Sequence, residues 1–154
     1  MHSTYRSTLT TSAVLICLAL LGSTAIAQPP QYEVTSGPYT VYYTLFPSTF
    51  IKPEVAGAYG ITRGKNKAVL NVSVRKALPD GSDRAQSAAV SGYSSDLIHK
   101  TPLPFTEIRE QGALYYLADI TVTGSPILYF ELKVQPDPNS SVIPISFKQQ
   151  LFTD

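Results

Sequence analysis

The strongest constraint on this sequence is a series of short runs rich in Val, Ile, Thr, Tyr and Phe, separated by clusters of Gly, Pro, Asn and Asp. Such runs predict short strands joined by turns. Residues 113–122 and 127–134 alternate most clearly, because every even-numbered residue in them is apolar. The other runs cover residues 39–46, 68–75, 87–93, 103–109 and 142–152. About seven short strands with turn signals between them predict an all-β fold, an immunoglobulin-like antiparallel β-sandwich.

One short helix is expected between Pro53 and Gly60. Proline suits the first helical position, where its missing N–H costs nothing. Glycine suits the left-handed residue that ends a helix. The sandwich is therefore expected to carry this helix after its first long strand.

The two most regular runs are predicted to pair as an antiparallel hairpin. Opposite residues in such a ladder point to the same face, so two even-numbered apolar faces require a loop of odd length. A loop over residues 123–125 sets Ala118 opposite Phe130, and Pro126 then begins its strand, where a missing N–H is tolerated. In this register, one outward-facing surface is formed by Tyr115, Asp119, Tyr129 and Lys133.

The first 27 residues have the layout of a secretory signal peptide. A positive charge precedes an apolar run over residues 13–22, and Ala25 and Ala27 place small side chains before the expected cleavage after Ala27. Such a run is too short to span a bilayer, which needs about 20 apolar residues. We therefore expect a periplasmic protein with no membrane span after cleavage. Residues 28–38 should form a linker or first strand, and residues 39–154 a single β-sandwich domain.

The composition of the mature chain excludes several classes of protein. Cys17 is the single cysteine and leaves with the signal peptide, so the fold must depend on its hydrophobic core without disulfides. The sequence has 12 Lys and Arg against 11 Asp and Glu, and the two signs become equal once Arg6 is removed. Nucleic-acid binding requires a dense basic surface, so we expect no nucleic-acid partner.

Histidine and cysteine are too scarce for an obvious catalytic or metal centre. His99 is the single histidine after the signal peptide, and Asp96 lies three residues before it. No nucleophile-elbow motif surrounds any serine, so His99 is expected to be an ordinary loop residue. Zinc normally takes several His, Cys or carboxylate ligands. We expect no catalytic residue, no metal and no cofactor.

Two charged segments have no obvious place in a core. Glu107, Arg109 and Glu110 put two carboxylates around an arginine, which glycoside hydrolases can use but which more often forms surface ion pairs. On a strand, Glu107 and Arg109 share one face and Glu110 lies on the other. Arg63 lies in a basic loop, and a guanidinium matches a carboxylate bidentately. We expect Arg63 to pair with Glu107 or Glu110 and to order two loops into one surface.

Two segments carry longer motifs. The first is STFIKPEVA at 48–56, continued by YGI at 59–61, Arg63 and AVLNVSV at 68–74. The second is FTEIRE at 105–110, followed by ALYYLA at 113–118. Both resemble the family of small exported bacterial proteins catalogued as domain of unknown function 4426. The resemblance covers nearly the whole mature chain and implies a periplasmic setting and a mainly β domain, with no established activity. At Tyr42 this chain departs from the family pattern, where a histidine is common, which argues further against a histidine-based site.

The candidate binding residues are the motif positions without a core role, together with one exposed aromatic position: Arg63, Asn71, Glu107, Arg109, Glu110 and Tyr115. The leading hypothesis is a non-enzymatic binding or accessory module whose partner is a protein or an envelope component. One alternative is a carboxylate-based hydrolase. Another is a chaperone-like module that pairs an exposed strand edge with a partner segment. An enzyme should gather several of these polar groups in a concave pocket, whereas a binding module should present them on a flat or ridged patch.

Overall fold

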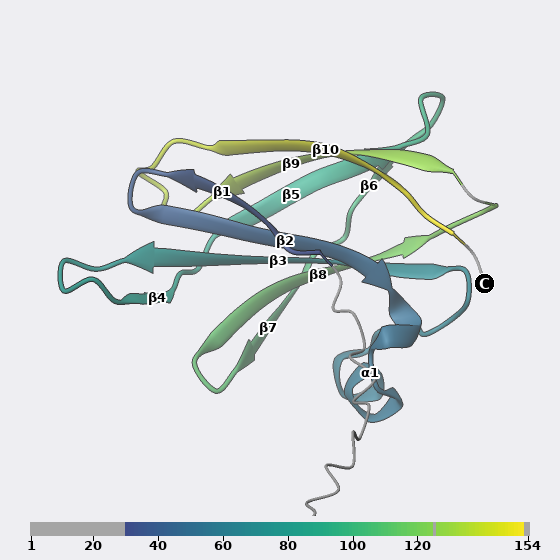
Figure 1. Cartoon of the computed structure of the whole chain (residues 1–154), viewed down its shortest axis with the longest axis horizontal. Helices are drawn as coiled ribbons and strands as arrows, with labels where there is room; N and C mark the ends of the chain where they lie inside the picture. Colours follow the sequence, from purple (N-terminus) through teal and green to yellow (C-terminus); the bar gives the residue numbers. More distant parts are fainter. Residues whose placement is uncertain (1–29, 125, 153–154) are drawn as a thin grey trace, which may run out of the picture.

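The computed structural model describes residues 30–124 and 126–152, which form two antiparallel sheets packed face to face (Figure 1). Sheet A has the strand order β1 (Tyr32–Ser36), β2 (Tyr39–Pro47), β3 (Lys67–Ala77), β8 (Ala113–Thr121) and β7 (Thr106–Glu110), with β4 (Asp83–Ala85) paired to β3. Sheet B has the order β10 (Ile143–Gln150), β9 (Ile127–Gln135), β5 (Ala89–Ser95) and β6 (Lys100–Pro102). The predicted all-β antiparallel sandwich with one short helix is confirmed.

The hydrophobic core lies between the two sheets, and the alternation in the sequence supplies it. The even-numbered side chains of residues 114–122 and 128–134 are all buried. An aromatic stack crosses from one sheet to the other. The ring centroid of Phe147 on β10 lies 4.7 Å from that of Phe130 on β9 and 4.9 Å from that of Tyr43 on β2. Stacked and tilted rings at these separations add to the stabilisation from burial.

The predicted hairpin is wrong, because β8 and β9 belong to different sheets. Ala118 of β8 lies opposite Leu70 of β3, and Phe130 of β9 lies opposite Phe147 of β10. Strands that face each other across a sandwich bury the same alternating residues as strands that pair within a sheet, so parity does not distinguish them. The surface predicted from that register is divided between the outer faces of the two sheets: Tyr115 and Asp119 on sheet A, and Tyr129 and Lys133 on sheet B.

The predicted helix is present as α1 (Pro53–Tyr59), with Pro53 in its first turn and Gly60 after its end at φ 66°. A 3-10 turn, η1 (Ser48–Phe50), precedes it. The Ser48 side chain is fully buried; its hydroxyl donates to the Gly64 carbonyl at 3.2 Å and accepts from the Gly64 N–H at 2.9 Å. This exchange ties η1 to the loop before β3 and so fixes where α1 sits.

The described chain has ten strands where about seven were expected. The additional strands are β1, β4 and β6, which have five, three and three residues. Segments this short carry too few positions to show an alternating pattern. β1 falls within the expected linker or first strand and pairs with β2 from Tyr32↔Tyr43 to Ser36↔Tyr39.

The predicted signal peptide, residues 1–27, lies outside the described residues. Within the described ranges, no helix is long and apolar enough to cross a membrane.

One end of the sandwich, on the right in Figure 1, carries most of the exposed large apolar side chains. We call it the open end: the C-terminal ends of β2, β5, β8 and β10, the N-terminal ends of β3, β6 and β9, and η1 with α1. The exposed apolar side chains there are Phe50, Val55, Leu97, Ile98, Ile127 and Phe152. Toward the opposite end, the exposed side chains of this kind among the described residues are Val142 and Tyr115. Concentrated exposed apolar side chains are a mark of interaction surfaces.

Candidate functional site

Arg63 does not meet the carboxylates that were expected to pair with it. Its Nη2 donates to the Thr49 carbonyl oxygen at 3.1 Å. The ion pairs found among the described residues do not include it. The predicted pairing of Arg63 with Glu107 or Glu110 is therefore wrong, and the guanidinium instead holds η1 against the loop before β3.

Glu107 and Arg109 form an ion pair on the inner side of β7, at the edge of sheet A. Arg109 Nε donates to Glu107 Oε1 at 2.6 Å, and Arg109 Nη2 donates to Ser87 Oγ at 2.9 Å. The buried Tyr116 hydroxyl donates to Glu107 Oε2 at 3.1 Å and accepts from the Ala88 N–H at 2.8 Å. Burial, together with the Glu107 carboxylate, raises the pKa of Tyr116. These bonds tie β7 and β8 to the chain that crosses to β5, so the pair acts as a clamp between the sheets.

The other nominated residues lie on the outer face of sheet A. The Glu110 carboxylate accepts a hydrogen bond from Tyr59 of α1, and this bond is the main cause of a raised pKa for Tyr59. Asn71 on β3 has a buried Oδ1 without a hydrogen-bond partner among the described residues. Tyr115 on β8 is 36% exposed. Because these residues are spread over three strands and both faces of β7, the nominated set does not form one site.

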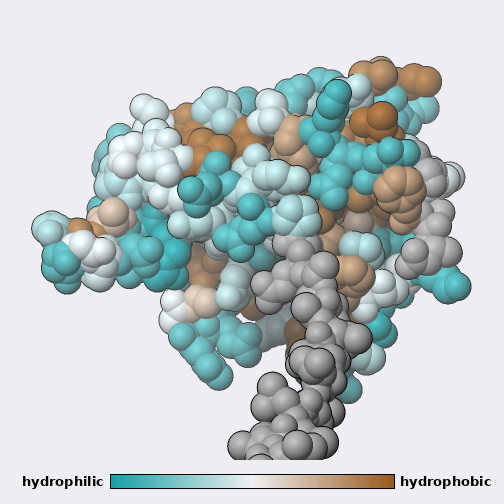
Figure 2. Space-filling model, viewed as in Figure 1, coloured by the Kyte–Doolittle hydropathy of each residue, from teal (hydrophilic) through white to brown (hydrophobic). Residues whose placement is uncertain are grey.

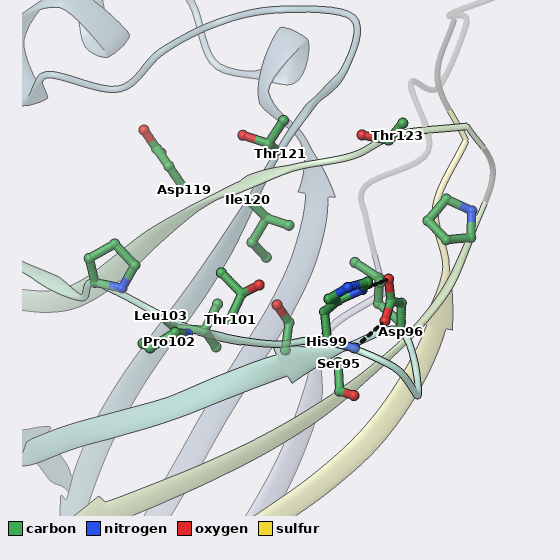
Figure 3. Close-up of a pocket in the computed structure, with 14 residues that line it drawn as sticks. Ser95, Asp96, His99, Thr101, Pro102, Leu103, Asp119, Ile120, Thr121 and Thr123 are labelled. Atoms are coloured by element: carbon green, nitrogen blue, oxygen red, sulfur yellow. Dashed lines mark hydrogen bonds and ion pairs between the residues drawn. The ribbon is translucent and has the colours of Figure 1, made fainter.

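A cavity of about 430 Å³ lies at the open end, between β8 and the β5–β6 hairpin (Figure 3). Its volume is within the range of about 300–1,000 Å³ that is typical of ligand pockets. None of the nominated residues lines it. In Figure 3, Ile120 extends from β8 toward Thr101 of the hairpin, whereas Asp119 and Thr121 point away from the cavity. The floor is apolar (Leu103, Ile120 and Leu128), and hydroxyl, carboxyl and imidazole groups of Thr101, Asp96 and His99 line the hairpin side.

One carboxylate binds two backbone amides of the β5–β6 turn, which forms one rim of the cavity. Asp96 Oδ1 accepts from the His99 N–H at 2.7 Å and from the Ile98 N–H at 3.0 Å, and these bonds lower the pKa of Asp96. The turn places Leu97 at φ 77°, a left-handed conformation that is uncommon for residues with a side chain. Leu97 and Ile98 are 76% and 83% exposed, and Figure 2 shows the tip of this protruding hairpin as apolar.

The cavity exists because β7 covers only half of β8. β7 begins at Thr106, opposite Leu117, so residues 118–122 have β3 on one side and none of the described strands on the other. Pro104, which has no N–H with which to continue a ladder, precedes β7 and diverts the chain. The predicted strand over 103–109 therefore starts later than expected, and half of β8 keeps an uncovered edge.

The uncovered edge presents backbone groups to the cavity. The Val122 N–H donates to the Asn66 carbonyl at 2.9 Å, on the β3 side. Backbone groups of successive strand residues point to opposite sides, so those of Asp119 and Thr121 face the uncovered side. A second hollow of about 170 Å³ lies along the same edge, and Pro104 and Asp119 line both hollows. We call the two hollows beside residues 117–123, which are the second half of β8 and the two residues after it, the edge groove.

The groove combines hydrogen-bonding groups with apolar surface. His99 Nδ1 lies 3.4 Å from Asp96 Oδ2, yet none of the hydrogen bonds of the described residues joins His99 to a serine hydroxyl. Within the described part of the chain there is no group of three or more His, Cys, Asp or Glu that could hold a metal ion. The arrangement is suited to binding an elongated ligand along β8.

Sequence reasoning missed this groove because backbone groups, rather than distinctive side chains, form one of its walls. The signal that pointed to it was the Pro102-Leu103-Pro104 segment, which ends β6 and delays β7. A proline just before the predicted strand over residues 103–109 and a second one inside it indicate that the strand is interrupted there.

Comparisons with known proteins agree with this fold. No curated protein matches the sequence. The crystal structure of a DUF4426 family protein from Pseudomonas aeruginosa PAO1 is similar, with 32% identity and a TM-score of 0.69 over 80% of this chain and 96% of that chain. FetP of uropathogenic Escherichia coli strain F11 is similar at 15% identity and a TM-score of 0.55, over 80% of this chain and 97% of that chain. A copper-bound FetP variant is similar at 13% identity and a TM-score of 0.51, over 79% and 97%.

The two FetP structures are too distant in sequence to show more than a common fold. The family model for domain of unknown function DUF4426 matches residues 33–154. This match confirms the resemblance carried by the motifs around Arg63 and Glu107. The chain therefore belongs to the DUF4426 family.

Proposed function

We propose that this protein is a non-enzymatic binding module of the periplasm and that the edge groove is its ligand site. The observation that carries the proposal is the coincidence of three features at the open end. An apolar-floored cavity of about 430 Å³ lies beside an uncovered strand edge, and exposed apolar side chains lie at the same end of the sandwich. Ligand sites typically combine a concave apolar surface with a few polar groups that fix orientation.

The periplasmic setting rests on the predicted signal peptide and on the family resemblance. FetP, which shares the fold, was recombinantly expressed in the periplasm of Escherichia coli. One FetP structure contains copper. Among the described residues of this chain, no cluster of three or more potential ligands is present, so the residues do not fit a copper centre and we assign none to the groove.

The placement of Glu107 and Glu110, the two carboxylates nominated from the sequence, gives the hydrolase hypothesis no support. Glycoside hydrolysis needs two carboxylates that flank one bond. Glu107 lies on the inner side of β7 and is bonded to Arg109 and Tyr116, whereas Glu110 lies on the outer side and is bonded to Tyr59. Both side chains already have structural partners, which favours the binding hypothesis.

Photo-crosslinking in the producing bacterium tests the proposal. A photoreactive amino acid replaces Thr101 in the groove. The matched controls place it at Ser146, on the outer face of β10, and at Val142, at the opposite end of the sandwich; all three positions are exposed. We expect an adduct at Thr101 and none at either control. No adduct at Thr101, or the same adduct at all three positions, would contradict the proposal.

A further inference from the structure

We propose that the ligand of the edge groove is an extended segment of a partner protein, which adds as a strand to the part of β8 that β7 does not cover. This inference rests on the proposed function of the groove and names its ligand class. Strand addition uses main-chain hydrogen bonds for affinity and pockets for alternate side chains for specificity. The groove offers both kinds of contact.

The main-chain contacts come from Asp119 and Thr121. Their N–H and C=O groups face the uncovered side, and none of the backbone hydrogen bonds of the described residues engages them there. Together they present two donors and two acceptors in the spacing of alternate strand residues. A strand added at the usual separation of about 4.8 Å would therefore continue the ladder that β7 begins at Leu117.

The side-chain contacts lie on the two faces of such a strand. One face would meet the apolar floor at Leu103, Ile120 and Leu128. The other would meet the second hollow, which Ile61 and Ile108 line. Because side chains of a strand alternate between faces, the groove selects a segment whose alternate residues are apolar.

Other strand edges of the sandwich carry features that discourage pairing. β10 carries Pro144 and Lys148, and β6 ends at Pro102. Proline, lysine and short strand length are the usual means by which natural edges avoid addition. β1 and β7 have five residues each. The uncovered half of β8 lies within a nine-residue strand and has neither proline nor lysine, so it lacks these deterrents to pairing.

The test variant is Thr121→Pro. The Thr121 N–H faces the groove, so proline removes a donor offered to the ligand and leaves the ladder with β3 in place. The matched control is Ser146→Pro on the free edge of β10. The Leu151 N–H donates to the Pro126 carbonyl, so odd-numbered residues of β10 face β9, and the Ser146 N–H faces solvent as native Pro144 does. Melting curves establish that both variants fold.

The probe is a library of short linear peptides displayed on phage and selected on the mature wild-type protein. We expect enriched peptides with alternating apolar residues. Thr121→Pro should weaken their binding about tenfold or more, and Ser146→Pro by less than roughly twofold. If Thr121→Pro does not fold, the decisive reading is hydrogen exchange on the wild type, where bound peptide should protect the Asp119 and Thr121 amides.

The outcomes separate the two proposals. Peptides that bind Thr121→Pro as tightly as the wild type, or that leave the Asp119 and Thr121 amides unprotected, overturn strand addition. A library that yields no binder also overturns it. A small molecule captured at Thr101 by photo-crosslinking would keep the groove as the ligand site and overturn strand addition alone. If Thr101 captures nothing, both proposals fail.

Discussion

Replacing Gly92 by alanine should destabilise the sandwich, because β5 approaches β9 too closely at this position for a side chain. An added Cβ would lie 2.4 Å from the Glu131 carbonyl oxygen and 2.8 Å from Leu132 Cδ2. The carbonyl belongs to the backbone of β9, so the two strands must move apart. The Gly92 carbonyl also accepts the Leu103 N–H at 3.0 Å, where the chain leaves β6 and forms the groove wall. Overpacking of this kind costs about 1–3 kcal/mol.

Gly57→Ala is the matched control with the opposite expected sign. Gly57 lies within α1, and an added Cβ would meet nothing within 4 Å. Alanine in place of a helical glycine should stabilise the protein by about 0.5–1 kcal/mol. Both substitutions add one methyl group, so the difference between their effects on the free energy of unfolding reports the surroundings of the two positions.

Urea unfolding of the mature protein, followed by circular dichroism, measures both variants. We expect the free energy of unfolding to fall for Gly92→Ala and to rise slightly for Gly57→Ala, with the dependence on urea unchanged. A Gly92→Ala protein as stable as the wild type would show that β5 and β9 do not approach this closely, and would contradict the described wall of the groove.

Three further predictions test the clamp, the hairpin turn and the exported chain. Tyr116→Phe leaves the Ala88 N–H without its partner and should cost about 1–3 kcal/mol in urea unfolding; unchanged stability would refute the clamp. The lowered pKa of Asp96 means that its stabilisation of the turn is present above the ordinary value of 3.8 and lost as pH falls through the lower folded value. The chemical shift of the His99 backbone amide should change over that pH range. A change at higher pH would contradict this role of Asp96. Reductant should leave the melting temperature of the mature protein unchanged, because the predicted cleavage after Ala27 removes Cys17; a drop of several degrees would contradict a fold without disulfides.

The sequence predicted which residues are buried better than it predicted which strands pair. Parity correctly placed Ala118 and Phe130 in the core. It assigned the wrong neighbours, because burial between two sheets and pairing within one produce the same alternation. Ala118 lies opposite Leu70 and Phe130 lies opposite Phe147, and both pairings depend on the topology of the whole chain.

The candidate site was harder to predict than the fold. Glu107 and Arg109 were nominated because the sequence shows no structural role for these charges. In the structure they have one, as partners of Ser87 and Tyr116, which come from other strands and loops. The edge groove depends on where β7 starts and on backbone groups that every residue has. In the sequence, Pro102 and Pro104 are the available sign that a strand is interrupted there.

Hydrogen exchange of the isolated mature protein tests the central claim most directly, since it needs no ligand. The Ile120 and Val122 amides face β3, and the Asp119 and Thr121 amides face the groove. We predict slow exchange at Ile120 and Val122 and fast exchange at Asp119 and Thr121. Protection of Thr121 equal to that of Ile120 would mean that the β8 edge is already covered, and the groove could not be the ligand site.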